Sequence, residues 1–418
     1  MTYIKPEINP SQLPTSVSQV LYMGLAAAQQ QDWLSVCDCL KQLPQTKSRK
    51  KPKQFVLTAK DWQAAQAIAF GVLIEADFQH KWAISKLIPL FGNEIVPLLT
   101  ALVKDRTVEA DVRWFVCRIL GQFKSEEVAI ALVELLQQAT DRELVEIAGK
   151  TLSEIGDDAV AALSSLIAQP EYSLLAVQSL FYIRTAKTIE PLLEVTSNPD
   201  PQLRAIAIKA LGSFHDRRIA PVLIRALQDK ASKVRIEAAI ALGFRSDLAD
   251  ELDLTSHLSL LLSDFNLEVC RQAATSLGRM KQEAANQALF KALQAETTPI
   301  NLKLDLVKAL GWSELKSEID YLERALANSS ETVVREIITI LGRVSVLELK
   351  PLATQVLLNF WQTPRRELTP QLKQSLATSL GELRCQDAKA TLEQLARDSD
   401  RKIQLHAKSA LKKISIDS

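Results

Sequence analysis

One segment of this chain recurs about every 31 residues. Residues 200–212 read DPQLRAIAIKALG, and residues 233–243 repeat them almost unchanged as KVRIEAAIALG. Arg204 and Arg235 lie 31 residues apart, as do the Leu-Gly pairs that close the two copies. A period of this size indicates stacked helical units, each packed only against its neighbours. The length of 418 residues agrees with such an array, because a single core stops growing at roughly 250 residues.

Ten copies can be aligned on a closing leucine, and seven of these leucines are followed by glycine. The closing leucines are Leu120, Leu152, Leu180, Leu211, Leu242, Leu277, Leu310, Leu341, Leu380 and Leu411. The whole chain has only 12 glycines, so seven at one register belong to the repeat. We expect glycine there for two reasons: it can adopt positive φ at a helix end, and it lets the following helix pack closely.

Each copy carries apolar residues at the closing leucine and at the positions four and eight residues before it. In residues 200–212 these are Leu203, Ala207 and Leu211. Residues four apart share one face of a helix, so the three positions form a buried stripe. A second apolar helix follows each Leu-Gly, for example at 128–136 and 219–227. We therefore predict an all-α fold, an α-α superhelix of about ten to eleven helix pairs.

The N-terminal residues depart from this pattern. Residues 1–14 contain three prolines and are predicted to form a flexible arm. Residues 15–60 are predicted to form two helices, the second capped by Asp32, followed by a basic linker, and residues 61–418 the repeat array. A basic run such as 47–53 is most often solvated, although contact with nucleic acid or an acidic partner is an alternative.

Charge and composition restrict the classes of partner. Lys and Arg total 50 against 49 Asp and Glu, so the net charge of +1 provides no global field for nucleic acid or an anionic membrane. No segment approaches the roughly 18 apolar residues of a membrane span, and the first residues lack the pattern of a signal peptide. The five cysteines lack the spacing of a disulfide framework. We expect a cytoplasmic protein that binds no nucleic acid.

Residues 200–212, and more loosely 234–243 and 269–278, follow the pattern D-P-x-[LV]-R-x-x-A-x-x-A-L-G. In this they resemble HEAT-like repeats of the phycobilisome-lyase family, over residues 82–414. The resemblance implies an α-α superhelix, which that family uses in phycobilin lyase subunits, phycobilisome-degradation factors and general scaffolds. It also implies that the helix with the [LV]-R pair lines a concave groove.

The resemblance further implies that the repeat arginine pairs with an aspartate in a turn between helices. Arg204 would pair with Asp200 or Asp229, and Arg235 with Asp229 or Asp264. In other copies this position holds Cys270, Val334 and Gln404.

The chain contains no motif that indicates catalysis or a metal site. Its four histidines are isolated in sequence, and no His-Glu dipeptide of the kind carried by HEAT-repeat di-iron hydroxylases occurs. P-loop, G-x-S-x-G and G-x-G-x-x-G sequences do not occur either. We therefore assign no catalytic residue and no metal ligand.

The positions two and six residues before each closing leucine are predicted to face the groove, because they lie about 160° from the buried stripe. Six of these twenty residues are basic and one is acidic. The candidate partner-binding residues are Trp114, Arg118, Lys150, Gln178, Lys209, Arg271, Lys308 and Arg335. This bias predicts an anionic, partly apolar partner, such as an acidic protein segment or a phycobiliprotein.

Two functions fit these features. The first is a non-enzymatic interaction scaffold without a cofactor, with a role in phycobilisome or photosynthetic-complex assembly. The alternative is a phycobilin lyase or isomerase subunit, or a bilin-handling chaperone, that holds a bilin through its propionates. Its predicted bilin contacts are Trp114, Arg118, Tyr172 and Tyr182.

Overall fold

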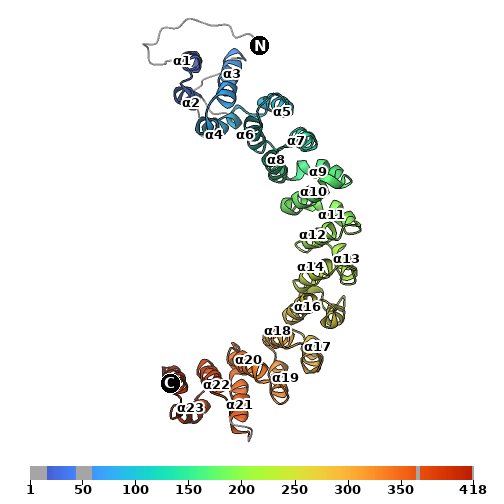
Figure 1. Cartoon of the computed structure of the whole chain (residues 1–418), viewed down its shortest axis with the longest axis vertical. Coiled ribbons are helices and arrows are strands. Elements are labelled where there is room, and N and C mark those ends of the chain that lie inside the picture. Colours follow the sequence, from blue (N-terminus) through green and yellow to red (C-terminus); the bar gives the residue numbers. More distant parts are fainter. Residues whose placement is uncertain (1–16, 44–58, 364–367, 417–418) are drawn as a thin grey trace. The chain divides into compact units, whose positions relative to one another are not determined.

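The computed structural model describes residues 17–43, 59–363 and 368–416, and every regular element in these ranges is a helix (Figure 1). The predicted arm and the basic run at 47–53 lie outside the described residues. The chain divides into two compact units, residues 1–195 and 196–418, each of which is described by itself. These limits cut the chain differently from the predicted domains, whose boundaries stay a prediction.

The first unit consists of helix pairs joined by short turns. Its elements are α1 (Val17–Gln29), α2 (Trp33–Lys41), α3 (Ala59–Glu75), α4 (Phe78–Ser85), η1 (Ile88–Phe91), η2 (Asn93–Ile95), α5 (Val96–Lys104), α6 (Ala110–Leu120), α7 (Glu126–Gln138), α8 (Arg142–Ile155), η3 (Gly156–Ala159), α9 (Val160–Ile167), α10 (Pro170–Ile183), η4 (Ala186–Thr188) and α11 (Ile189–Val195). Helices α4, α6, α8 and α10 pack side by side in one layer, and α5, α7 and α9 pack in the other. Asp32 caps α2 as predicted, because its carboxylate accepts a 3.2 Å hydrogen bond from the Ser35 backbone N–H.

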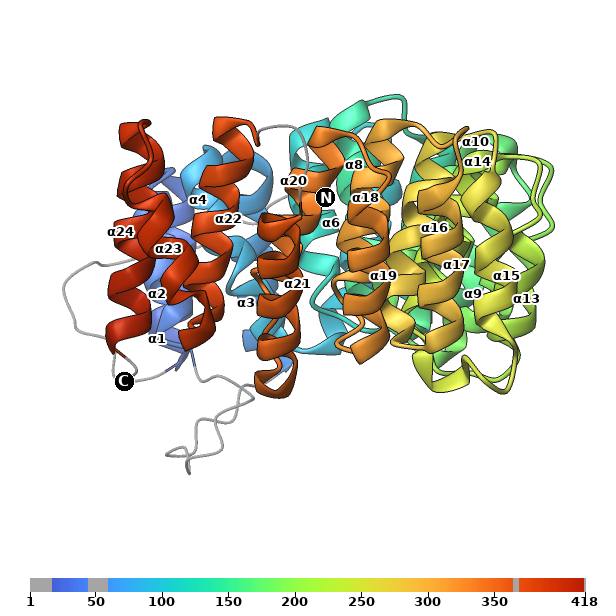
Figure 2. The same ribbon diagram turned by 90° about the horizontal axis from the view of Figure 1, so that it is seen from below.

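The second unit continues the same alternation. Its elements are α12 (Pro201–Leu211), α13 (Ile219–Ala226), α14 (Ser232–Gly243), η5 (Ser246–Leu248), α15 (Leu254–Leu260), η6 (Leu261–Ser263), α16 (Leu267–Met280), α17 (Glu283–Gln294), α18 (Ile300–Leu310), α19 (Lys316–Leu326), α20 (Glu331–Leu341), η7 (Leu347–Leu349), α21 (Lys350–Gln362), α22 (Pro370–Leu383), η8 (Gln386–Ala388), α23 (Lys389–Leu395) and α24 (Arg401–Ile416). The even-numbered helices from α12 to α24 each pack against the next, and Figure 2 shows their axes running alongside one another.

The predicted apolar stripe is the core of both units. All ten closing leucines lie on even-numbered helices, and nine are fully buried, whereas Leu411 is half-buried. The residue four positions before the closing leucine is fully buried in every copy. Tyr172, eight positions before Leu180, is half-buried instead. Periodicity in the sequence therefore located the contacts that hold each stack together.

At the closing Leu-Gly pairs, one of the two expected reasons for glycine is wrong. Gly212 has φ of −58°, an ordinary helical value, and positive φ among the described glycines occurs at Gly92 and Gly156 instead. The other reason, close packing, applies to a different helix than expected: a Cβ on Gly212 would lie 2.7 Å from the Ala241 Cβ of α14, the next even-numbered helix, and not against α13, which follows in the chain. A Cβ on Gly278 would lie 2.6 Å from the Ala309 carbonyl oxygen of α18. Glycine here permits close packing of successive even-numbered helices.

The implied arginine–aspartate pairs are present in two successive turns of the second unit. Arg204 donates 2.8 and 2.7 Å hydrogen bonds to Asp229, and its remaining nitrogen donates to the Asn198 carbonyl at 2.8 Å. Arg235 bonds Asp264 at the same two distances. The hydrogen bonds from Arg204 hold the pKa of Asp229 below its usual value. These arginines therefore connect one helix pair to the next.

Where the arginine is replaced, part of this arrangement persists. The Cys270 thiol donates to the Asp264 carbonyl at 3.2 Å, and the Gln404 amide donates to the Asp398 carbonyl at 2.8 Å. Both substitutes contact a turn carbonyl, as the arginines do, without an ion pair of their own to the aspartate. Lys373 pairs with Asp398 at 2.9 Å.

In the described ranges, no single helix is long and apolar enough to cross a membrane. One bent pair, residues 78–91 with 93–104, meets the length and composition requirement only when both segments are joined, across an angle of 115°.

Candidate functional site

The predicted groove positions lie on the even-numbered helices, on the surface opposite the buried stripe. We call this surface the even-helix face of each unit. Of the twenty residues two and six positions before the closing leucines, only Ala205 is buried, and the others are half-buried or exposed. These side chains are accessible to a partner, and their role in a binding groove stays a prediction.

In the second unit, carboxylates on the same or a neighbouring helix neutralise several of the candidate cations. Lys209 lies 3.9 Å from Glu237. Arg271 Nε lies 2.9 Å from Asp305, an ion pair rather than a well-aligned hydrogen bond, and Lys308 lies 3.6 Å from the same carboxylate. Glu237 and Asp305 both stand five residues before a closing leucine, a position that the sequence argument did not consider. Part of the predicted cationic bias is therefore balanced.

The remaining candidates differ in their surroundings. Arg335 of α20 is exposed. Lys150 of α8 lies 4.0 Å from Glu154 on the same helix, and both side chains are largely exposed. A surface pair of this kind contributes little, and its lysine stays available to a partner.

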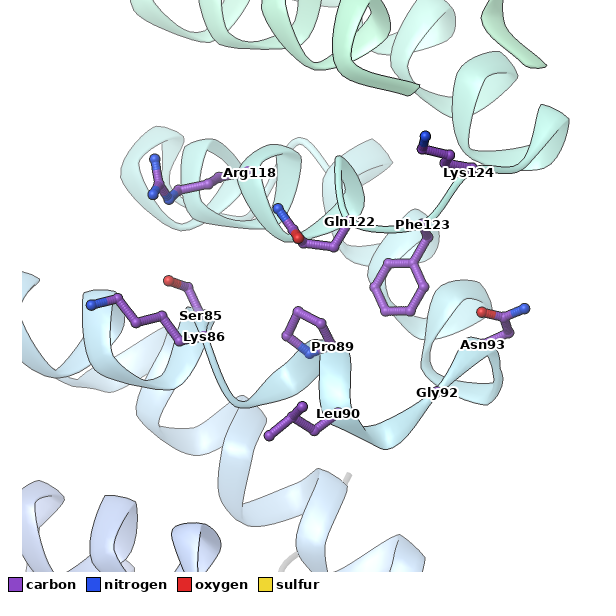
Figure 3. Close-up of a pocket in the computed structure, with 10 residues that line it drawn as sticks. All are labelled: Ser85, Lys86, Pro89, Leu90, Gly92, Asn93, Arg118, Gln122, Phe123 and Lys124. Atoms are coloured by element: carbon purple, nitrogen blue, oxygen red, sulfur yellow. The ribbon is translucent and has the colours of Figure 1, made fainter. Parts of the chain in front are cut away.

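A cavity of about 610 Å³ lies in the first unit between α4 with η1 on one side and the C-terminal end of α6 on the other (Figure 3). We call it the Arg118 cavity. Its walls are Ser85, Lys86, Pro89, Leu90, Gly92, Asn93, Arg118, Gln122, Phe123 and Lys124. Three of these residues are cationic and none is acidic. In Figure 3, Pro89 and Phe123 face each other across the middle, with Lys86 and Arg118 toward one end and Lys124 toward the other.

Trp82 of α4 holds two of these cations in place. The Arg118 guanidinium lies 4.0 Å from the centroid of the Trp82 ring, and the Lys86 ammonium lies 5.7 Å from it. A cation over an aromatic face is attracted to the ring and keeps its N–H donors. No ion pair joins Lys86, Arg118 or Lys124 to a carboxylate within the described part of the chain. These cations are free to bind an anionic group.

A second cavity, of about 570 Å³, lies between α8 and α10, and we call it the Tyr182 cavity. Its walls are Glu146, Gly149, Lys150, Ser153, Glu154, Leu175, Gln178, Ser179 and Tyr182. Three predicted residues, Lys150, Gln178 and Tyr182, meet here, and Tyr182 is 69% exposed. Gly149 and Leu175 pack so closely that a Cβ on Gly149 would lie 3.0 Å from the leucine side chain.

The four predicted bilin contacts do not line one cavity. The Trp114 and Phe115 rings are nearly perpendicular, with their centroids 5.2 Å apart. Arg118 lines the Arg118 cavity. Tyr172 precedes Tyr182 by ten residues on α10, about 15 Å along a helix axis, and does not line the second cavity. The bilin contacts therefore stay a prediction.

The titratable side chains of the described ranges form no cluster of the kind that holds a metal ion. No three His, Cys, Asp or Glu side chains converge at ligand distance there. Burial raises the pKa of the Cys117 thiol to about 12, which disfavours the reactive thiolate. The Arg118 cavity, the Tyr182 cavity and the even-helix faces contain the predicted partner-binding residues that are accessible.

Sequence comparison identifies the repeats that build these surfaces. Segments 72–148, 95–180, 189–256 and 254–342 match the HEAT repeats family, and together they span more than half of the chain. The chain belongs to the HEAT-repeat family. The predicted all-α solenoid of helix pairs is therefore confirmed. No curated protein matches this HEAT-repeat chain in sequence.

Several solved structures are similar to this chain at low sequence identity. Importin beta is 13% identical, with a TM-score of 0.50, and the match covers 96% of this chain and 60% of that one. Kap121p bound to Pho4p is 14% identical, with a TM-score of 0.44 and coverages of 96% and 56%. Human deoxyhypusine hydroxylase in complex with glycerol is 19% identical, with a TM-score of 0.29 and coverages of 65% and 99%. At this identity, the match to importin beta shows similarity of fold alone.

Proposed function

We propose that this HEAT-repeat protein is a non-enzymatic scaffold whose first unit binds an acidic, partly apolar segment of a partner protein. The observation that carries this proposal is the Arg118 cavity, which combines three cations, no acidic wall residue and an apolar middle formed by Pro89 and Phe123. A carboxylate in such a cavity accepts charge-assisted hydrogen bonds, which are stronger than those between neutral groups. The apolar middle suits an aliphatic or aromatic side chain next to that carboxylate.

The Tyr182 cavity extends the proposed interface along the same even-helix face. Helix α8 packs directly against α6, which carries Arg118, and against α10, which carries Tyr182. Aromatic and arginine side chains are over-represented among the residues that dominate protein interfaces. A partner segment that follows the face would place acidic groups at Arg118 and an apolar group at Tyr182.

Affinity capture from native cells, followed by titration of the captured protein, tests the proposal. We expect the double variant Arg118→Glu/Lys124→Glu to weaken binding by at least tenfold, because each substitution replaces an attraction with a repulsion. The matched control is Arg106→Glu/Lys187→Glu, which makes the same charge change at exposed sites outside both cavities. Equal binding by the two double variants would refute the proposal.

The resemblance to the phycobilisome-lyase family makes a phycobiliprotein in the cytoplasm the first partner to test, and it keeps the bilin alternative open. The feature that favours the alternative is the Tyr182 cavity, where Lys150 and Tyr182 lie beside apolar Leu175. Co-expression with a bilin and an apo-phycobiliprotein separates the two functions. Bilin absorbance transferred to the acceptor supports a lyase, whereas a retained, unmodified acceptor supports the scaffold.

A further inference from the structure

A row of aromatic and arginine side chains crosses four successive even-numbered helices of the second unit. Two residues after the closing leucines of α14, α16, α18 and α20 stand Phe244, Arg279, Trp312 and Arg343. All four are exposed, Phe244 at 62% and Trp312 at 45%. Each helix packs against the next, so residues at equal register are neighbours. We call these four residues the aromatic–arginine row.

Each aromatic ring of the row has an arginine nearby: one pair is in direct contact, and the other shares a cavity. The Arg279 guanidinium lies 4.4 Å from the centroid of the Phe244 ring, and Trp312 and Arg343 line one cavity together. Stacking on a ring fixes the plane of a guanidinium and leaves its N–H edge free for a bidentate carboxylate. The row thus presents oriented donors beside exposed aromatic surface.

The cavity beside Trp312 has a volume of about 320 Å³. Ile340, Val344 and Leu349 contribute apolar walls, and Arg343 also lines this cavity. This volume is at the lower end of the range of about 300–1,000 Å³ for ligand sites, so it suits one bulky side chain better than a cofactor.

The charges next to the row favour an acidic occupant. Glu314, the exposed carboxylate in the cavity wall, is already paired with Lys281. Glu318, the other acidic wall residue, is 3% exposed and accepts hydrogen bonds from the Glu314 N–H and the Ser313 hydroxyl. Neither Arg279 nor Arg343 forms an ion pair with a carboxylate among the residues that the structure describes. Two guanidinium groups therefore remain for a partner.

We propose that the aromatic–arginine row docks an acidic linear segment of a partner protein, with a bulky apolar side chain entering the cavity beside Trp312. This site goes beyond the proposed function, because it lies in the other unit and shares no residue with the Arg118 cavity. Two guanidiniums are too few to hold a nucleic-acid strand, whose binding depends on neutralising many phosphates.

Geometry gives the spacing of the segment. Packed helices lie about 8–10 Å apart, so Arg279 and Arg343, two helices apart, are separated by roughly 16–20 Å. An extended peptide advances about 3.3 Å per residue. The two acidic residues are then about five to six positions apart, with the apolar residue between them and nearer the one that binds Arg343.

The test uses a fluorescent peptide with two glutamates about six positions apart and a leucine between them, titrated against the full chain by anisotropy. We expect saturable binding, at least tenfold weaker binding to Arg279→Glu/Arg343→Glu, and weaker binding to Trp312→Ala. The matched control is Arg324→Glu, because Arg324 also stacks on a ring, 4.6 Å from the Phe290 centroid, on the odd-numbered helix α19. This variant should bind the peptide like the wild type.

Further peptides and variants test the proposal. A peptide with lysines in place of the glutamates should bind the Arg279→Glu/Arg343→Glu variant, and this rescue also shows that the variant is folded. If that variant does not fold, the single variant Arg343→Gln replaces it. No binding to the wild type, equal binding of a glutamine peptide, or tighter binding of single-stranded oligothymidine would overturn the proposal. The variant Arg118→Glu/Lys124→Glu should bind the peptide normally, because it leaves the aromatic–arginine row unchanged. Failure of the first-unit proposal can therefore be distinguished from failure of this one.

Discussion

The burial and the pKa of a single residue in this protein depend on contacts beyond its own helix. Glu318 is the third residue of α19, where a carboxylate ordinarily caps a helix in water. Here the carboxylate instead accepts a 3.0 Å hydrogen bond from the Glu314 N–H, one residue before the N-cap Leu315, and the side chain is almost fully removed from solvent. Burial raises the pKa of Glu318 to about 7, although its two hydrogen bonds act in the opposite direction.

This raised pKa predicts a pH-dependent stability. Between about pH 5 and pH 7 the folded chain retains a proton on Glu318 that the unfolded chain has released, so the free energy of unfolding falls as pH rises. A rise from 4.5 to about 7 corresponds to on the order of 3 kcal/mol. Glu318→Gln removes this dependence. In urea unfolding, the variant should therefore gain stability relative to the wild type from pH 5 to pH 8.

Glu323→Gln, at an exposed site on the same helix, is the control for that experiment. Its stability relative to the wild type should not change over the same pH range. A constant difference between Glu318→Gln and the wild type at every pH would contradict the assignment.

At the scale of the helix, stacking depends on the residue that follows the closing leucine. Gly278 faces backbone atoms of α18, which cannot rotate away as a side chain can. Gly71, in the middle of α3, has no heavy atom within 4 Å of an added Cβ, apart from its own local backbone. The two glycines therefore offer a matched comparison of close packing against open space.

Replacing these glycines by alanine should give results of opposite sign. Gly278→Ala is expected to destabilise the fold by about 1–3 kcal/mol, because the new methyl group overpacks the contact with Ala309. Gly71→Ala should be neutral or stabilising by up to about 1 kcal/mol, since alanine favours a helix over glycine. Thermal unfolding of both variants measures the difference. Equal melting temperatures would show that α16 and α18 separate at little cost.

Hydrophobic periodicity and capping residues were sufficient to predict the helices and their buried faces, because both are properties of a single helix. The resemblance to HEAT repeats implied that Arg204 pairs with Asp200 or Asp229, and the structure shows the pair with Asp229. The cavities could not be predicted, since each is formed by side chains from two or three separate elements. The aromatic–arginine row was missed for a simpler reason. The sequence argument took its groove positions only from residues before the closing leucine, and the row lies two residues beyond it.

Across the whole molecule, a net charge of +1 conceals local imbalance. Carboxylates balance Lys209, Arg271 and Lys308, whereas Arg118 in the first unit and Arg279 and Arg343 in the second have no such partner among the described residues. The near-zero net charge argues against binding of nucleic acid. It does not argue against binding of acidic protein segments at the helices that carry these unpaired cations. The two proposed surfaces lie in different units and share no residue.

If both proposals hold, the two surfaces should be occupied independently. Saturating the row with the glutamate peptide should change the affinity of the captured first-unit partner by less than twofold. Calorimetric titration of that partner, with and without the peptide, measures this coupling. Mutual exclusion would show that one partner uses both surfaces.

The separation between stacking residues and row residues has a consequence for protein engineering. The stripe and the glycine contact determine whether a helix pair joins the array, and neither uses the position two residues past the closing leucine. That position can therefore be substituted one helix at a time, with an aromatic, cationic or anionic residue chosen for a new ligand. This chain can serve as a template whose binding preference is rewritten while its architecture is left intact.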